Sequence, residues 1–87
     1  MDLHITLENA GDALTVRVAG RLGADGSAEL ERACRDEVRL RLDLSELVTA
    51  DEEGTRLLVR LRNAGAELAG VPPYIDLLLR ARSMRIP

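Results

Sequence analysis

The sequence predicts a single α/β domain with a mixed β-sheet and helices mainly on one face of that sheet. Two stretches near the amino terminus alternate apolar and polar residues, with the period of two that is typical of a half-buried strand. Strand-like and helix-like segments then alternate along the chain, which favours parallel pairing of the later strands, because each crossover contains a helix. The expected order is β-β-α-β-α-β-α over residues 1–87, with one hydrophobic core.

Residues 2–19 are expected to form an amino-terminal hairpin. The apolar positions of its two strands are Leu3, Ile5, Leu7, Leu14, Val16 and Val18. The turn between the strands is Asn9-Ala10-Gly11-Asp12, which is rich in turn-forming residues. His4 falls on the polar side of the first strand, where we expect it to face solvent.

A first helix is expected after a glycine-punctuated loop, with Asp25 or Ser27 as its cap. The glycines of this loop are Gly20, Gly23 and Gly26. The apolar stripe of the helix recurs at helical spacing at Leu30, Ala33, Cys34 and Val38. A third strand follows from Arg39 to Leu44, where leucines alternate with charged residues, so one of its faces is expected to be wet.

The second helix is expected to begin after Asp51, a good N-cap, and to end at Asn63-Ala64-Gly65. Its buried stripe is predicted at Leu57, Leu58, Leu61 and Ala64. A short strand from Ala66 to Val71 would complete the sheet.

Pro72-Pro73 then opens a third helix, because proline is tolerated at the first helical position. Leu77, Leu78 and Ala81 are expected to face inward. Residues 80–87 contain arginines and no acid, and we expect them to form a frayed basic tail.

Composition excludes several classes of function. The net charge of -3 and the pI of about 5.1 argue against DNA or RNA as a partner. The only aromatic residue, Tyr74, cannot supply the stacking faces that single-stranded nucleic acid requires.

No segment is typical of a signal peptide or a membrane span, and the lone Cys34 cannot form an internal disulfide, so we expect a cytoplasmic protein. A domain this small has a thin stability margin, to which a second copy could contribute as a homodimer.

The inventory of reactive side chains argues against catalysis. His4 is far in sequence from Ser27, Cys34 and Ser45, so a nucleophile paired with a histidine base is not expected. One Cys and one His are too few ligands for structural zinc, and the glycines do not form a phosphate loop. We therefore expect no enzymatic activity, no metal ion and no cofactor.

The most informative segment runs from Leu42 to Gly54 and leads from a strand through a short turn into a helix. It places three carboxylates, Asp51, Glu52 and Glu53, at the helix start. The helix amino terminus carries a partial positive charge, so each carboxylate is stabilised there by roughly 0.3–1 kcal/mol. The same free N–H groups could hold a phosphoryl group.

This segment resembles the signature of the STAS domain, the module shared by sulphate transporters and bacterial anti-sigma factor antagonists. In that family a strand of the type Leu-Asp-Leu-Ser-Gly-Val leads into Asp-Ser-Ser-Gly or Asp-Ser-Thr-Gly. The similar segments here are Leu42-Asp43-Leu44-Ser45-Glu46-Leu47 and Asp51-Glu52-Glu53-Gly54. Weaker similarities to other elements of the family lie at Val18 to Leu22, Ala28 to Leu30, Gly65 to Leu68 and Pro73 to Leu79. The resemblance thus covers nearly the whole chain and implies a STAS-like fold.

The departures from the family pattern concern phosphorylation. In anti-sigma factor antagonists the serine after the motif's aspartate is phosphorylated by the anti-sigma factor, which is a kinase. Glu52 occupies that position and Glu53 the next, so the motif has no hydroxyl to accept phosphate. The family's frequent aspartate after Gly-x-Leu falls on Gly23, with Asp25 as a displaced substitute.

Two interpretations of Glu52 and Glu53 are open. Two carboxylates carry about the charge of one phosphoserine, about -1.5 to -2, and could hold the domain in one signalling state. Alternatively, the phosphorylation role is lost and the glutamates only stabilise the helix start, which the helix dipole explains without any partner.

The resemblance also implies a protein partner that docks on the second helix and on the loop before it. The expected docking residues are Val48, Thr49, Arg56, Arg60 and Asn63. We expect a non-catalytic regulatory module, either an anti-sigma factor antagonist that cannot be phosphorylated at the usual site or a regulatory subunit of a transporter or sensory complex. The rival hypothesis is a small-ligand-binding module with a nucleotide or other anion near residues 20–26 and the helix start. The charges of Glu52 and Glu53 disfavour an anion there.

Overall fold

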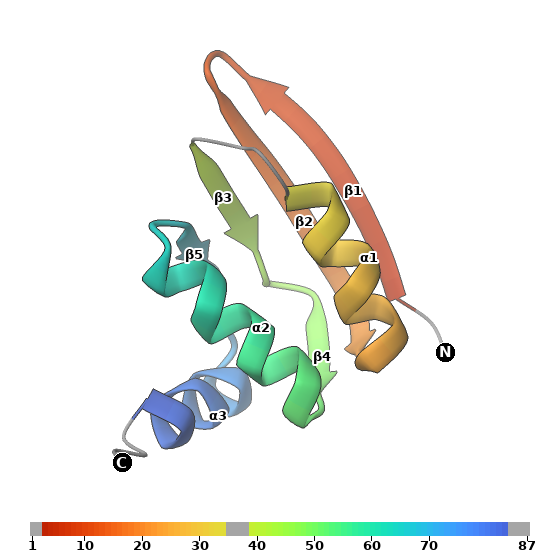
Figure 1. Ribbon diagram of the computed structural model, residues 1–87, viewed down its shortest axis with the longest axis vertical. Helices are drawn as coiled ribbons and strands as arrows, with labels where there is room; N and C mark the ends of the chain where they lie inside the picture. Colours follow the sequence, from red (N-terminus) through yellow and green to blue (C-terminus); the bar gives the residue numbers. More distant parts are fainter. Residues whose placement is uncertain (1–2, 35–38, 84–87) are drawn as a thin grey trace.

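The three-dimensional structure, a computed structural model, describes residues 3–34 and 39–83. It is one α/β domain with a five-stranded mixed sheet and three helices, which confirms the predicted fold class (Figure 1). The elements are, in order, β1 (Leu3–Ala10), β2 (Ala13–Leu22), α1 (Ala24–Cys34), β3 (Leu40–Asp43), β4 (Leu47–Ala50), α2 (Glu52–Asn63), β5 (Glu67–Ala69) and α3 (Pro73–Ser83).

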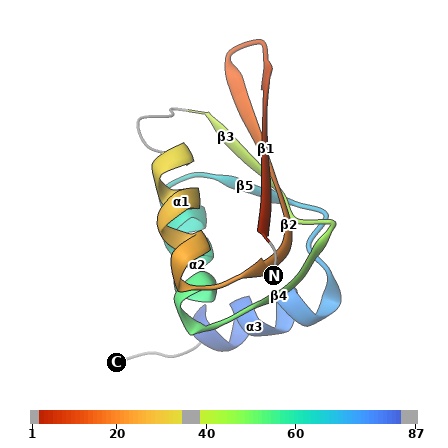
Figure 2. The same cartoon turned by 90° about the vertical axis from the view of Figure 1, so that its right-hand side faces the viewer.

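The helices lie mainly on one side of the sheet, as predicted. Figure 2 shows the sheet nearly edge-on, with α1 and α2 side by side on one face and α3 across one end, where it contacts α2 and β4. The opposite face carries polar and charged side chains at paired positions, including Thr6 beside Arg17 and Arg41 beside Glu67. That face can stay in water without a covering layer because it buries few apolar groups.

The amino-terminal hairpin is tighter and longer than the alternation predicted. Ala10 pairs with Ala13, so the turn consists of Gly11 and Asp12 alone, and Gly11 takes a positive φ of 66°. Glycine suits this position because it adopts such a φ at no steric cost. His4 is exposed on β1, as expected.

Strand β2 is the centre of the sheet, antiparallel to β1 and parallel to two later strands. Its first part, Leu14 to Arg17, pairs with β3. Its last part, Gly20 to Leu22, pairs with β4, with a register shift between Gly20 and Arg21. β3 in turn pairs in parallel with β5. The parallel pairing predicted from the helical crossovers is confirmed.

Strand β4 is absent from the predicted order, which had seven elements rather than eight. Its four residues, Leu47 to Ala50, have no strict apolar–polar alternation, so the period-two signal that predicts a half-buried strand is missing. The segment becomes a strand because β2 runs on to Leu22 and offers it a partner.

The longer β2 also corrects the predicted loop before α1. Gly20 lies in β2 and Gly26 lies in α1, so only Gly23 connects the two elements. Asp25 and Ser27, the predicted caps, both lie inside the helix. Val38 of the predicted stripe is outside the described residues.

The core is aliphatic and lies between the sheet and the helices. Its buried members include Val16, Val18, Leu22, Leu30, Leu42, Leu44, Leu57, Leu58, Ile75 and Leu79. In α2 the predicted stripe holds for Leu57 and Leu58, whereas Leu61 is half-buried and Ala64 is the exposed C-cap.

The predicted inner face of α3 is wrong at Leu77 and Ala81. Leu77 is 65% exposed and Ala81 is also exposed, while Ile75 and Leu79 are buried and Leu78 is half-buried. Positions four apart lie on the same face of a helix, so Ile75 and Leu79 point together towards the core and Leu77, between them, points away.

The predicted frayed tail of residues 80–87 is wrong for its first four positions. Helix α3 runs to Ser83, so positions 80–83 are helical, and Arg80 pairs with Asp76 one turn earlier (Nε to Oδ2, 2.8 Å). The remainder of the predicted tail lies outside the described residues.

Candidate functional site

Asp51 caps the start of α2, as the sequence predicts. Its backbone is extended, and its Oδ1 accepts a hydrogen bond of 2.8 Å from the amide of Gly54. Its own amide donates to the carbonyl oxygen of Leu22 at 3.0 Å. One residue thus satisfies a free N–H group of the helix and ties the helix start to the end of β2.

Gly54 holds the helix start close to the sheet. A Cβ atom at this position would lie 2.5 Å from the carbonyl oxygen of Leu22 and 2.8 Å from its Cγ. Contacts that short are not tolerated, so the glycine of the Asp51-Glu52-Glu53-Gly54 motif is required by a close approach between α2 and β2.

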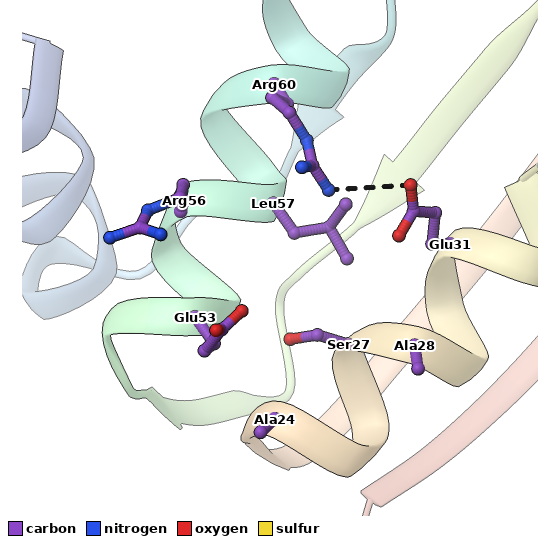
Figure 3. Close-up of a pocket in the computed structure, with 8 residues that line it drawn as sticks. All are labelled: Ala24, Ser27, Ala28, Glu31, Glu53, Arg56, Leu57 and Arg60. Atoms are coloured by element: carbon purple, nitrogen blue, oxygen red, sulfur yellow. Dashed lines mark ion pairs between the residues drawn. The ribbon is translucent and has the colours of Figure 1, made fainter.

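Glu52 and Glu53 occupy the first turn of α2, and both side chains are exposed. Glu52 pairs with Arg56 one turn later, with 3.3 Å between Oε2 and Nη2. An exposed pair of this kind contributes only about 0.3–0.5 kcal/mol. For Glu53 the described part of the chain provides no ion pair or hydrogen bond, and its carboxylate points into the space between α2 and α1 (Figure 3).

The predicted docking residues do not all lie in one cluster. Val48 is 66% exposed on β4, and Thr49 beside it is half-buried opposite Arg21 of β2. Arg60 does not join the acidic turn but pairs with Glu31 of α1, with 3.6 Å between Nη2 and Oε2. Asn63 is exposed at the end of α2. The structure therefore joins Glu52 with Arg56 and links Arg60 to the neighbouring helix.

A small cavity between α1 and α2 was not predicted from the sequence (Figure 3). Its volume is about 140 Å³, and it is lined by Ala24, Ser27, Ala28, Glu31, Glu53, Arg56, Leu57 and Arg60. The only sequence signal for it is the spacing of Ser27 and Glu31, which puts both on one face of α1. That α2 would cover this face is a matter of tertiary packing.

A shallow depression lies where the rival hypothesis places an anion, around residues 20–26. Its charged lining consists of Arg21, Asp25 and Glu29. Two carboxylates against one guanidinium disfavour an anion there.

Asp43 fixes the turn between β3 and β4, inside the segment that resembles the STAS signature. Its Oδ1 accepts hydrogen bonds from the amide of Ser45 at 3.0 Å and from the hydroxyl of Ser45 at 2.8 Å. Its Oδ2 lies 3.4 Å from Nε of Arg17 on β2. The hydrogen bonds from Ser45, and to a smaller extent Arg17, lower the pKa of the Asp43 carboxyl below its usual 3.8.

This pKa shift predicts a stability change in acid. Because the pKa is lower in the folded chain, Asp43 contributes stability that is present above about pH 4 and is lost as the pH falls through the folded pKa. We expect Asp43→Asn to lower the urea midpoint at neutral pH and to reduce its fall between about pH 5 and pH 2.5. Asp12→Asn, in the exposed hairpin turn, removes the same charge as a control. An acid dependence of Asp43→Asn identical to that of the wild type would contradict this role.

None of the helices in the described ranges combines the length and apolar character needed to cross a bilayer. Within residues 3–34 and 39–83, no three His, Cys, Asp or Glu side chains are grouped so that they could hold a metal ion.

No known family profile matches the sequence, and no curated protein matches it significantly. The fold, in contrast, is similar to those of solved structures.

One is the anti-sigma factor antagonist SpoIIAA in its unphosphorylated form, with a TM-score of 0.66 and 17% identity, covering 88% of this chain and 82% of that one. A second is an anti-sigma factor antagonist STAS domain from Rhodobacter sphaeroides, with a TM-score of 0.58 and 24% identity over 78% of this chain and 86% of that one. A third is an uncharacterized protein from Shewanella loihica with a SpoIIAA-like fold, with a TM-score of 0.54 and 16% identity over 98% of this chain and 80% of that one. The chain therefore has the SpoIIAA-like fold of STAS domains.

Proposed function

We propose that this chain is a non-catalytic regulatory module that binds another protein in the manner of an anti-sigma factor antagonist. The docking surface consists of the turn from Val48 to Gly54 and the outer face of α2, with Arg56, Arg60 and Asn63. The observation that carries the proposal is the exposure of Val48, an apolar side chain beside the capped helix start. The fold it shares with two anti-sigma factor antagonists supports the same function.

Val48 has the properties of an interface anchor. Leu47 and Ala50 of the same strand are buried. Leu47 and Thr49, on either side of Val48, pair with β2, so the exposed side chain projects from a backbone that is held on both sides. Binding then needs little ordering of the chain, which favours affinity. Arginines such as Arg56 and Arg60 are enriched at interfaces and would surround this apolar contact with polar ones.

The proposed module acts without phosphorylation of its helix start. None of the four residues from Asp51 to Gly54 carries a hydroxyl. Pairing of Glu52 with Arg56 compensates one of the two glutamate charges within α2. This pairing favours the interpretation in which the glutamates stabilise the helix over the one in which they imitate a phosphoserine.

The test is binding to a panel of purified anti-sigma factor kinases, measured by calorimetry. We expect at least one kinase to bind the wild type and Val48→Asp to weaken that binding roughly tenfold or more, because the new carboxylate would be desolvated at the interface. Leu7→Asp introduces the same charge at an exposed leucine of β1, away from the docking surface, and is expected to leave the dissociation constant unchanged.

Phosphorylation of the chain by the same kinases is measured by mass spectrometry after incubation with ATP. We expect no phosphate on residues 51–54. Equal affinities for Val48→Asp and Leu7→Asp, or no binding to any kinase, would contradict the proposed docking. Phosphate on Thr49 or Thr55 would show that phosphorylation still controls this site.

A further inference from the structure

The cavity between α1 and α2 contains a buried hydroxyl group without a partner. Ser27 is only 7% exposed, and its Oγ has no hydrogen-bond partner within the part of the chain that the structure describes. Its side chain points from α1 towards α2, into the space between the helices (Figure 3). A buried hydroxyl that makes no hydrogen bond is costly, and such groups usually mark a site that water or a ligand completes.

Glu53 faces the same cavity from α2. Its carboxylate points towards the Ser27 side of the gap (Figure 3), and no partner for it is found among residues 3–34 and 39–83. Two hydrogen-bond acceptors, the carboxylate and the serine oxygen, thus border one small space.

The cations that border the cavity are already paired. Arg60 is bound to Glu31 at one end, at 3.6 Å. Arg56 is bound to Glu52, at 3.3 Å, and its guanidinium points away from the cavity (Figure 3). The group left without a counter-charge is the Glu53 carboxylate, so the cavity favours a cation with N–H donors over an anion.

We propose that this cavity binds a primary ammonium group, which donates hydrogen bonds to the Glu53 carboxylate and to Oγ of Ser27. Its volume of about 140 Å³ suits a compact ammonium on a short alkyl chain, and Leu57, Ala24 and Ala28 provide an apolar wall for that chain. Rotation about the Cβ–Oγ bond turns the hydroxyl hydrogen away from the ligand, so that a lone pair of the serine oxygen accepts the hydrogen bond. A free amine and a lysine side chain of another protein both carry such an ammonium, and the chemistry of recognition is the same for the two.

The test is an NMR titration of the isolated, ¹⁵N-labelled chain with butylammonium chloride. We expect saturable shifts of the amides of Ser27, Glu53 and Leu57. Tetramethylammonium chloride, which has the same charge and no N–H donor, is expected to cause no such shifts.

Three variants test the two proposed hydrogen-bond acceptors. Glu53→Gln should weaken binding of butylammonium roughly tenfold, because it removes a charge-assisted hydrogen bond, and Ser27→Ala should weaken it by a smaller factor. Glu29→Gln, an exposed position of α1 outside the cavity lining, is the charge-matched control and should bind as the wild type does.

A second arm distinguishes the sources of the ammonium. Acetyl-Gly-Lys-Gly-amide is compared with its norleucine analogue and with butylammonium. Tighter binding of the lysine peptide assigns the site to a protein side chain, and equal binding assigns it to a free amine. The proposal is overturned if neither probe saturates, if tetramethylammonium binds as well, or if Glu53→Gln and Ser27→Ala leave the affinity unchanged. Because no partner protein is present, failure here leaves the proposed docking function intact.

Discussion

Replacing Gly54 with alanine is expected to destabilise the domain by about 3 kcal/mol, because a Cβ atom would overlap the carbonyl oxygen of Leu22. The obstacle is backbone, which cannot move aside as a flexible side chain can. To accommodate the methyl group, α2 would have to shift away from β2 and stretch the hydrogen bond between Asp51 and Leu22. In a domain whose total stability is on the order of 5 kcal/mol, most of the folding free energy would be lost.

Urea denaturation followed by circular dichroism measures this loss, and Gly23→Ala is the matched control. At Gly23 a Cβ atom would lie 3.4 Å from Oδ2 of Asp51, an ordinary contact with the end of a side chain. We expect Gly23→Ala to change the free energy of unfolding by less than about 1 kcal/mol. If both variants were equally stable, the close approach of α2 to β2 would be disproved.

Replacing Leu79 with alanine is expected to cost about 2–5 kcal/mol, the usual range for a leucine removed from a core. Leu79 is 2% exposed in the face of α3 that packs against the rest of the domain. Leu77, on the same helix, is 65% exposed, and Leu77→Ala should stay within about 0.5 kcal/mol of the wild type.

The two leucine variants keep helix propensity equal, since each replaces leucine with alanine in the interior of α3. Their thermal and urea midpoints therefore report burial alone. A larger loss for Leu77→Ala than for Leu79→Ala would restore the inner face predicted from the sequence and contradict the orientation of α3.

The elements that the sequence predicts correctly are those with strong local signals. Asp51 is predicted as a cap because an acid precedes an apolar stripe at helical spacing, and the structure confirms it. The hairpin follows from alternation around a Gly-Asp turn, and its observed partners keep that alternation.

The errors occur where the local signal was weak or ambiguous. Leu77, Leu78 and Leu79 are consecutive, so the pattern of apolar residues alone does not determine which of them faces the core. Only the position of Ile75, four residues before Leu79, indicates the buried face, and the run of three leucines obscures this signal. β4 exists because β2 offers it a partner, and no window of four residues contains that information.

In the candidate site, too, the features that depend on local sequence were predictable and those that depend on tertiary packing were not. The capped helix start and the exposure of Val48, Arg56, Arg60 and Asn63 concern residues within one short stretch of chain. The ion pair between Arg60 and Glu31, and the cavity beside it, depend on the packing of α1 against α2. Contacts between segments that are distant in the sequence produce no periodic pattern of residues in either segment.

The division of β2 between two parallel partners has a consequence for local unfolding. β3 pairs with residues 14–17 of β2, whereas β4 pairs with positions 20–22 only, and the register shift lies within this second pairing. Opening of the β4 ladder would break no pairing of the hairpin or of β3, but it would expose the buried Leu47 and Ala50. Val48 and the start of α2 would be released with them as one cooperative unit. A partner that binds only the closed form would add its binding free energy to the stability of that unit, so docking and the order of this corner of the sheet are thermodynamically linked.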